Sequence, residues 1–230
     1  MGYKDSMRVL VPEGTSGYWQ VERFTVDKQD AQVERLRALA SSERGRGVPA
    51  GTYTRLMYRG SVVMSDTPDE MDDHLDMVRH ARDRILINGL GLGMVLQACL
   101  ERKRVRQSAT GEPYMLEDGS WEQEPYVTHA TVIECDPDVI ALVAPHYQER
   151  YGDRLEIIQA DAYTWQPPKG IRYHACWHDI WSDLCPDNLA DMTRLKHKYA
   201  RRTDWQGCWS EGLLRYEAKR EKRERARWNW

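Results

Sequence analysis

Residues 84–96 have the sequence Arg-Ile-Leu-Ile-Asn-Gly-Leu-Gly-Leu-Gly-Met-Val-Leu, and this stretch decides the fold. A buried strand is expected to end at Asn88, and Gly89, Gly91 and Gly93 then form the pattern G-x-G-x-G before an apolar helix. Glycine at alternate positions lets the backbone turn tightly and approach a ligand. The helix N-terminus behind it offers free N–H groups and a positive dipole end. Alone, the pattern has low specificity, because glycines between a strand and a helix also serve tight packing.

The composition places the chain among ordinary globular proteins. It has 230 residues, of which 41% are hydrophobic and 30% charged, and a net charge of -3. This length suits one α/β domain with a small appendage, and the charge gives no electrostatic argument for nucleic acid or an anionic membrane. No apolar run has the length of a signal peptide or a membrane span. Five scattered cysteines without C-x-x-C spacing favour a reducing, cytoplasmic location over a disulfide framework or a zinc site.

The first third of the chain, residues 1–66, is expected to form a small β-rich appendage with one helix. Alternating patterns predict strands over residues 7–11 and 18–25. A helix capped by Asp27 is expected to continue to about residue 40, and residues 52–64 have the pattern of a hairpin.

From residue 67 onward, strands and helices alternate, which predicts a parallel sheet with helices on both faces. The fold class is therefore α/β, a doubly wound, Rossmann-like and mostly parallel sheet over residues 67–205. The strands after the glycine turn are expected at residues 130–134, 155–159 and 173–178.

Two segments stand apart from this core. Residues 101–128 form an insertion with a short hairpin around Asp118-Gly119; its role is open, and a lid over the cleft is one candidate. Residues 206–230 form a charged C-terminal helix whose i,i+4 pairs are typical of a solvated face. Trp228 and Trp230 at its end could dock on the body or on a second subunit, so a homodimer remains an option.

Three of the predicted strands end in an acid or are closely followed by one, namely Glu134, Asp161 and Asp179. Because ligands bind at the carboxyl ends of strands in a doubly wound sheet, these acids and the glycine turn should converge on one cleft. An acid after the second strand can accept both hydroxyl protons of a ribose. An acid after the third can accept from the exocyclic amine of adenine, and one after the fourth faces the reacting end.

These motifs together resemble the class I S-adenosylmethionine-dependent methyltransferases, and more closely their spermidine-synthase-like branch. The resemblance covers about residues 52–200 without the insertion. It implies S-adenosylmethionine as the cofactor, with the three glycines at its methionine part, Glu134 at its ribose and Asp161 at its adenine. The residues that carry it are Asp69-Glu70, Ile133-Glu134-Cys135-Asp136, Asp161-Ala162 and the run from Tyr173 to Asp179.

The chain departs from the spermidine synthases at three places. Their glycine loop carries an aspartate where this chain has Leu92, and the tyrosine of their substrate helix corresponds to Asp73. Their double-acid signature becomes Asp179-Ile180-Trp181-Ser182-Asp183. Without the loop acid there is no obvious anchor for an aminopropyl amine, so these changes favour methyl transfer over polyamine synthesis.

Asp179 is the candidate general base, because it lies at the reacting end of the cleft and could remove a proton from an amine or hydroxyl. A helix-capping or structural role is its alternative. Trp181 and Asp66 are the substrate-binding candidates. His178 should point to the opposite face of its strand, and His74, among aspartates, is expected on a solvated helix face. No His, Cys or acid has metal-ligand spacing, so no metal is predicted.

Three functions follow as hypotheses. The first is a methyltransferase that acts on a small molecule or an unidentified acceptor. The second is a spermidine-synthase-like aminopropyltransferase, and the third is an adenosyl-cofactor-binding protein without transfer activity. Nucleic acid is not favoured as a partner, because neither the Asp/Asn-Pro-Pro-aromatic nor the Pro-Cys signature of base methyltransferases follows the fourth strand. An NAD enzyme would show G-x-G-x-x-G with an acid about 20 residues later. This chain instead has the tighter pattern G-x-G-x-G, and its acid, Glu134, comes later because of the insertion.

Overall fold

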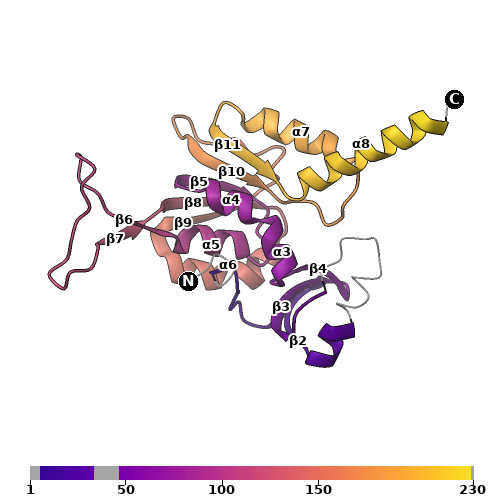
Figure 1. The fold of residues 1–230 in the computed structure, drawn as a ribbon, viewed down its shortest axis with the longest axis horizontal. Helices are drawn as coiled ribbons and strands as arrows, with labels where there is room; N and C mark the ends of the chain where they lie inside the picture. The colour runs from indigo at the N-terminus through magenta and orange to yellow at the C-terminus, as the bar shows by residue number, and fades with distance from the viewer. Residues whose placement is uncertain (1–5, 34–46, 229–230) are drawn as a thin grey trace.

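The structure is a computed structural model that describes residues 6–33 and 47–228. Its centre is a five-stranded, fully parallel sheet in the order β11-β10-β5-β8-β9 (Figure 1). The first strand along the chain, β5, lies in the middle, and the later strands are added on both of its sides, as expected for a doubly wound sheet. The strands are β5 (Asp83–Asn88), β8 (Val127–Glu134), β9 (Leu155–Gln159), β10 (Tyr173–His178) and β11 (Thr203–Cys208).

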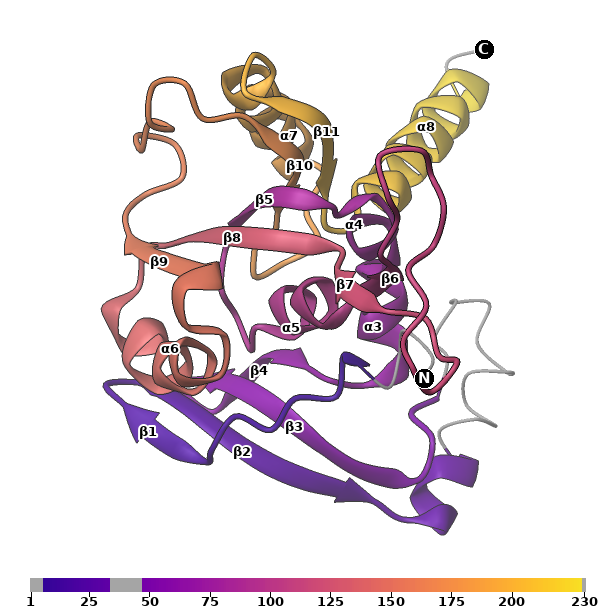
Figure 2. The same ribbon diagram turned by 90° about the vertical axis from the view of Figure 1, so that its left-hand side faces the viewer.

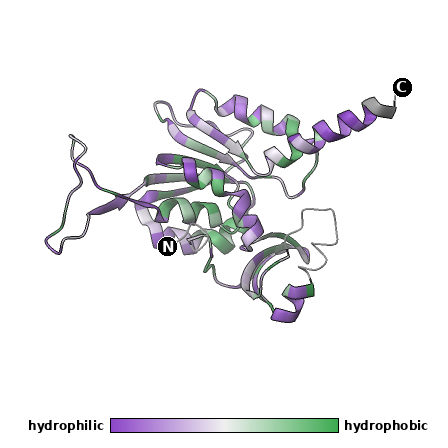
Figure 3. Ribbon diagram, viewed as in Figure 1, coloured by the Kyte–Doolittle hydropathy of each residue, from purple (hydrophilic) through white to green (hydrophobic). Residues whose placement is uncertain are grey.

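Helices cover both faces of this sheet, because successive side chains of a strand point to opposite sides. Ile85 and Ile87 of β5 belong to a core with the helices that precede and follow β5, whereas Leu86 packs in a second core with Leu195 and Tyr199. Figure 3 shows hydrophobic residues gathered at the first of these faces. The helices are α3 (Pro68–Asp73), α4 (Leu75–His80), α5 (Met94–Glu101), α6 (Pro137–Tyr151), the 3-10 turn η1 (Gly152–Arg154), α7 (Asn188–Tyr199) and α8 (Glu211–Trp228).

The N-terminal appendage is a four-stranded antiparallel sheet that lies against α6 (Figure 2). Two side-chain hydrogen bonds fasten it to the start of that helix. The Trp19 indole donates to Asp136 over 2.7 Å, and the Ser16 hydroxyl donates to Asp138 over 2.7 Å. Its strands are β1 (Gly14–Ser16), β2 (Trp19–Val26), β3 (Gly51–Tyr58) and β4 (Ser61–Ser65).

The α/β fold class and the antiparallel appendage agree with the sequence prediction, but several elements differ from it. Residues 7–11 do not form a strand; they are tied down by Asp66, which accepts the Val9 N–H over 3.1 Å. The connection between β9 and β10, residues 160–172, contains turns instead of a helix. Its aromatic side chains Tyr163 and Trp165 pack against the second core in the place of a helix.

The edge strand β11 was not predicted, because its sequence Thr-Asp-Trp-Gln-Gly-Cys has little apolar periodicity. It can pair closely because Gly207 lies between Trp177 and Trp205, where an added Cβ would be within 2.6 Å of either ring. The division into three parts stays a prediction, and its last boundary, after residue 205, falls inside β11. Of the helix expected from Asp27, residues 28–33 are described and the rest of that expectation lies outside the described residues.

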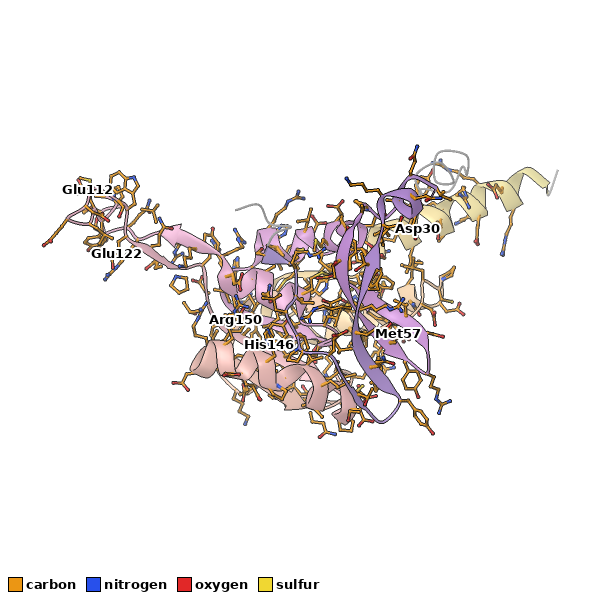
Figure 4. All side chains as sticks on the ribbon, turned by 90° about the horizontal axis from the view of Figure 1, so that it is seen from below. Asp30, Met57, Glu112, Glu122, His146 and Arg150 are labelled. Carbon is orange, nitrogen blue, oxygen red and sulfur yellow. The ribbon has the colours of Figure 1, made fainter. Side chains whose placement is uncertain are left out.

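Among the described residues, no helix is both long and apolar enough to cross a membrane. The predicted insertion contains a two-stranded ribbon that we call the arm, residues 103–125, built on β6 (Lys103–Val105) and β7 (Gln123–Pro125). Figure 4 shows that Glu112 and Glu122 of the arm lie well away from the body that contains His146 and Met57.

Candidate functional site

A cavity of about 500 Å³ lies at the carboxyl ends of strands β5, β8, β9 and β10. Its size is that of small-ligand sites, roughly 300–1,000 Å³. It lies where the strand order reverses, between β5 and β10, which is where doubly wound sheets bind their ligands. Among the described residues that line it, every charged side chain is acidic. The predicted site residues that line it are Gly89, Gly91, Glu134, Asp161, Asp179 and Trp181, whereas Gly93 and Asp66 do not.

The glycines of the turn have positive φ angles, and two of them lie close to neighbouring atoms at the cavity. Gly89 has φ of 97°, and an added Cβ would lie 1.9 Å from the Asp179 carbonyl oxygen. Gly91 has φ of 50°, and its Cβ would lie 2.7 Å from the sulfur of Met64. Close packing against backbone therefore accounts for Gly89, whereas the flexible Met64 side chain beside Gly91 can move. A cofactor role must rest on what surrounds the turn.

Gly93 lies below the cavity instead of in its wall. It adopts φ of 71° at the start of α5, and an added Cβ would lie 2.1 Å from the ring of Tyr147. The Tyr147 hydroxyl donates to the Leu92 carbonyl over 2.7 Å, and the Leu92 side chain is fully buried in the core. The position where spermidine synthases carry an acid is thus a packing position here.

Glu134 holds the glycine turn to the end of β8. One carboxylate oxygen accepts the Leu90 N–H over 2.8 Å, and the other accepts the Asp136 N–H over 2.9 Å. The residue is 9% exposed and faces the cavity. An ionised carboxylate has about four acceptor sites, so two further donors, such as the hydroxyls of a ribose, can still bind.

Asp161 follows β9 and begins a tight turn. Its Oδ1 accepts the Tyr163 N–H over 2.7 Å, and the residue lines the cavity. The next residue, Ala162, is held from behind, because its carbonyl accepts from both the Tyr199 hydroxyl and the Lys198 ammonium over 2.7 Å. The wall of the cavity at this acid is consequently well fixed.

Asp179 follows β10 and is the most perturbed carboxyl of the cavity. Its backbone N–H donates to the Asn88 carbonyl over 2.8 Å, which holds the residue beside the glycine turn. Its side chain is 11% exposed. Burial, together with the negative charges of Glu70 and Asp73, raises the pKa of Asp179 to about 7. A carboxyl with a pKa near neutrality can hold or release a proton at working pH.

His74 lies beside Asp179, and the expectation of a solvated helix face was wrong. The residue separates α3 from α4, is 0% exposed, and packs edge-on against Trp177. Its Nδ1 is 3.8 Å from a carboxylate oxygen of Asp179. Burial lowers the pKa of His74 to about 4, so the ring is neutral beside the acid. Within the described part of the chain, neither of its ring nitrogens has a hydrogen-bond partner.

Glu70 also lines the cavity, although the sequence indicates it only as part of the Asp69-Glu70 motif. Its carboxylate accepts the N–H and the hydroxyl of Ser65, each over 2.7 Å. Burial raises its pKa, with the nearby charge of Asp73 adding to the effect. Its place in the Asp69-Glu70 pair was a usable signal for a site residue.

The N-terminal sheet supplies one wall of the cavity, which no local pattern in the sequence indicated. Trp19 and Met64 line the cavity from β2 and β4. The Met64 sulfur accepts the Leu92 N–H over 3.3 Å, so the appendage touches the glycine turn directly. Trp181 and Trp209 form aromatic parts of the wall from the parallel sheet.

Asp66 lies elsewhere and has a structural role. Its two oxygens accept the N–H groups of Thr54 and Val9 over 2.6 and 3.1 Å, and the side chain is 1% exposed. It therefore joins the N-terminal segment to β3. His178, on the opposite face of β10 from the cavity, bonds to Asn88 over 2.7 Å as a packing residue.

The arm does not cover the cavity. It leaves the body between α5 and the beginning of β8, at the amino end of the sheet, whereas the cavity lies at the carboxyl end. None of the described arm residues lines the cavity. A lid, one candidate role for the insertion, does not fit this arrangement, because insertion and site lie at opposite ends of the strands.

No protein-family model matches the chain, and no curated protein matches it. Solved structures that are similar to part of it include a dimethyladenosine transferase from Plasmodium falciparum (17% identity, TM-score 0.33, covering 50% of this chain and 32% of that one). The N-methyltransferase NodS from Bradyrhizobium japonicum has 13% identity and a TM-score of 0.37, covering 59% and 63%. A human methyltransferase 10 domain containing protein has 13% identity and a TM-score of 0.39, covering 66% and 68%.

This chain thus spans between a third and two thirds of the length of those structures. With TM-scores below 0.5, the similarities establish neither the fold nor an activity for it. The fold is established by the strand order itself.

Proposed function

We propose that the protein is an S-adenosylmethionine-dependent methyltransferase that acts on a small molecule. The observation that carries the proposal is the cavity of about 500 Å³ at the switch point of the sheet, which is lined by the glycine turn and by one acid from the end of each of three successive strands. A nucleoside-containing ligand needs acceptors for its ribose and its base at such places.

The residues present fit this cofactor. Glu134 retains acceptor capacity for the ribose, and Asp161 has an oxygen for an adenine amine. The turn from Gly89 to Gly91 presents backbone without side chains at the cavity. The Leu92 N–H there donates to a thioether sulfur, which is a weak acceptor; a carboxylate would be a stronger partner for it.

When bound, the cofactor supplies an electrophilic methyl group on a sulfonium. The chain's own contribution is to position the acceptor and to take its proton. Asp179 is the base, because its raised pKa matches a proton-transfer role near neutral pH. The acidic lining from Glu70 and Asp179 suits an acceptor that carries a proton to lose, and the walls of Trp181 and Trp209 can pack on its apolar part.

Ligand binding tests the cofactor. S-adenosylhomocysteine should stabilise the protein in a thermal-shift assay and bind in calorimetry, whereas NAD should do neither. Glu134→Gln should weaken the affinity about tenfold or more, since it removes a charged hydrogen-bond acceptor. The matched control is Glu149→Gln, an exposed acid on α6. The proposal would be refuted if NAD alone stabilised the protein, or if none of the adenosyl ligands stabilised it.

Methyl transfer itself requires a second experiment. Labelled S-adenosylmethionine should pass its methyl group to members of a panel of small amines and hydroxyl compounds, and Asp179→Asn should abolish the transfer while S-adenosylhomocysteine still binds. Cofactor binding without transfer to any member of the panel would instead favour a non-catalytic binding protein.

Aminopropyl transfer is the second candidate, favoured by the pair of cavity acids Glu70 and Asp179, which could bind a diamine. The buried Leu92 argues against aminopropyl transfer. Spermidine synthases carry an acid at this position, but here the side chain points into the core and not toward a ligand. Tighter binding of methylthioadenosine than of S-adenosylhomocysteine would favour this candidate over methyl transfer.

A further inference from the structure

The arm projects from the body as a two-stranded ribbon (Figure 1). Its backbone is held by its own hydrogen bonds, in which Arg106 donates to Glu122, Tyr114 donates to Arg106 and Glu122 donates to Tyr114, over 2.8, 3.0 and 2.9 Å. Arg106 also stacks on the Tyr114 ring and pairs with the Glu122 carboxylate over 2.7 Å. Every residue from 109 to 121 is exposed. The arm therefore keeps a defined shape while burying nothing at its end.

The end of the arm, residues 111–121, which we call the tip, carries an unusual set of side chains for such a place. Tyr114, Met115, Leu116 and Trp121 are 44%, 63%, 47% and 46% exposed. Single exposed apolar residues need no explanation, but a contiguous group at the end of a projecting ribbon is typical of an interaction site. Tyrosine, tryptophan and methionine are also the residues that interfaces favour.

The charge of the tip restricts the kind of surface that it can bind. No lysine or arginine occurs from residue 107 to residue 126. The acids Glu122 and Glu124 are neutralised by Arg106 and Arg104 at the base of the arm, over 2.7 and 2.6 Å. The acids at the tip itself are Glu112, Glu117 and Asp118. Hydrogen bonds from Ser120 lower the pKa of Asp118, so this acid is ionised at neutral pH. The tip is thus apolar and negative.

The complementary surface is on α8 of the same chain. Residues 219–225 of this helix include five basic and two acidic residues, and all are exposed. The two acids pair within the helix, Glu224 with Arg220 and Glu221 with Arg225. Tyr216, one turn earlier, is 52% exposed and offers an aromatic surface. Figure 3 shows the outer part of α8 as hydrophilic and projecting from the body.

The tip and α8 lie at opposite ends of the longest axis of the molecule (Figure 1). One chain cannot bring them together. A second copy turned by 180° about an axis perpendicular to this length places each tip beside the α8 of the other copy. Both contacts are then made at once and the assembly closes, as two-fold interfaces do. We infer that the protein forms a two-fold dimer in which the tip of each chain binds α8 of its partner; this goes beyond the proposed function.

A charge exchange tests this dimer. Glu117→Lys/Asp118→Lys makes the tip basic, and Lys222→Glu/Arg223→Glu makes α8 acidic. Each variant alone meets like charge in both contacts and should be a monomer, with a dissociation constant raised about tenfold or more. An equimolar mixture should form a mixed dimer. One contact then joins the reversed tip to the reversed α8 and the other joins the native tip to the native α8, so both contacts pair opposite charges. Sedimentation velocity of the full chains, over a concentration series at low salt, measures all three states.

Two further measurements complete the test. Glu149→Lys, an exposed acid on α6 away from both surfaces, should dimerise like the wild type. Salt of about 1 M, at which charges are screened beyond roughly 3 Å, should weaken the wild-type dimer. A monomeric wild type, a larger assembly, dimeric single variants or a monomeric mixture would each overturn the inference.

Discussion

Asp179 is the residue at which burial and neighbouring charge act in the same direction. The carboxyl is removed from water beside Glu70 and Asp73, and His74 is neutral, so no cation compensates it among the described neighbours. A proton on Asp179 is therefore retained to about pH 7 in the folded protein, whereas the unfolded chain releases it near pH 4. This difference links the candidate base to the stability of the fold.

The first prediction follows from this linkage. Between about pH 4 and pH 7 the unfolded chain is ionised at Asp179 and the folded chain is not, so the free energy of unfolding falls as pH rises and then levels off. Asp179→Asn removes this pH-dependent contribution to the free energy of unfolding. As pH rises from about 4 to 7, the variant should therefore gain stability relative to the wild type. Urea denaturation at several pH values measures it. Asp183→Asn, at an exposed acid, is the control; a difference that stays constant with pH for Asp179→Asn would contradict the assignment.

Glu70 provides the second prediction. Among the neighbouring charges, that of Glu70 raises the pKa of Asp179 the most. Glu70→Gln removes the charge and keeps an acceptor for Ser65, so Asp179 should titrate at a lower pH. Carbon-detected NMR of the aspartate carboxyls follows the titration directly. An unchanged or higher midpoint in the variant would show that burial alone controls this acid.

At the scale of elements, the strand-to-helix turn after β5 depends on how closely α6 approaches it. Gly93→Ala places a methyl group 2.1 Å from the Tyr147 ring and also forces φ of 71° on a residue with a side chain. We expect a loss of about 2–4 kcal/mol in urea denaturation, from overpacking and backbone strain together. Gly60→Ala, at φ of 82° with no atom near its Cβ, should lose only the backbone part, about 1–2 kcal/mol. Equal losses at the two sites would contradict the packing role of Gly93.

The arm should be dispensable for the stability of the body. Arg106 and Glu122 are already hydrogen-bonded across the ribbon, so a two-residue Asn-Gly turn can replace residues 107–121. Because residues 109–121 are all exposed, the shortened chain should unfold within about 0.5 kcal/mol of the wild type. The comparison is made at low protein concentration and high salt, where subunit contacts do not contribute. A large loss would mean that the arm supports the body after all.

The elements also show which features a sequence can predict. The glycine turn and the acids after β8, β9 and β10 were found because strand-end positions follow from alternation and from parallel topology. His74 was missed because Asp72, Asp73 and Asp76 surround it in sequence, which is the local pattern of a solvated face. Its burial comes from the helix break at that residue and from Trp177, more than a hundred residues later.

At the scale of the whole molecule, the cavity belongs to two sheets. Trp19 is joined to Asp136 across more than a hundred residues of chain, and Met64 touches the glycine turn. No periodicity in residues 1–66 encodes that contact, because it depends on how the finished sheets dock. The appendage is therefore a part of the candidate site, although its sequence predicted only strands.

The last prediction rests on the fact that both sheets line the cavity. A ligand that fills the cavity contacts both sheets, so it should slow local opening of both in proportion to its occupancy. Hydrogen exchange in the presence of S-adenosylhomocysteine should show added protection in β2 and β4, around Trp19 and Met64, as well as in β5 and β8. NAD at the same concentration is the control and should leave both sheets unchanged. Protection limited to the parallel sheet would mean that the appendage does not enclose the cofactor. The part of the cavity lined by Trp19 and Met64 would then bind some other molecule.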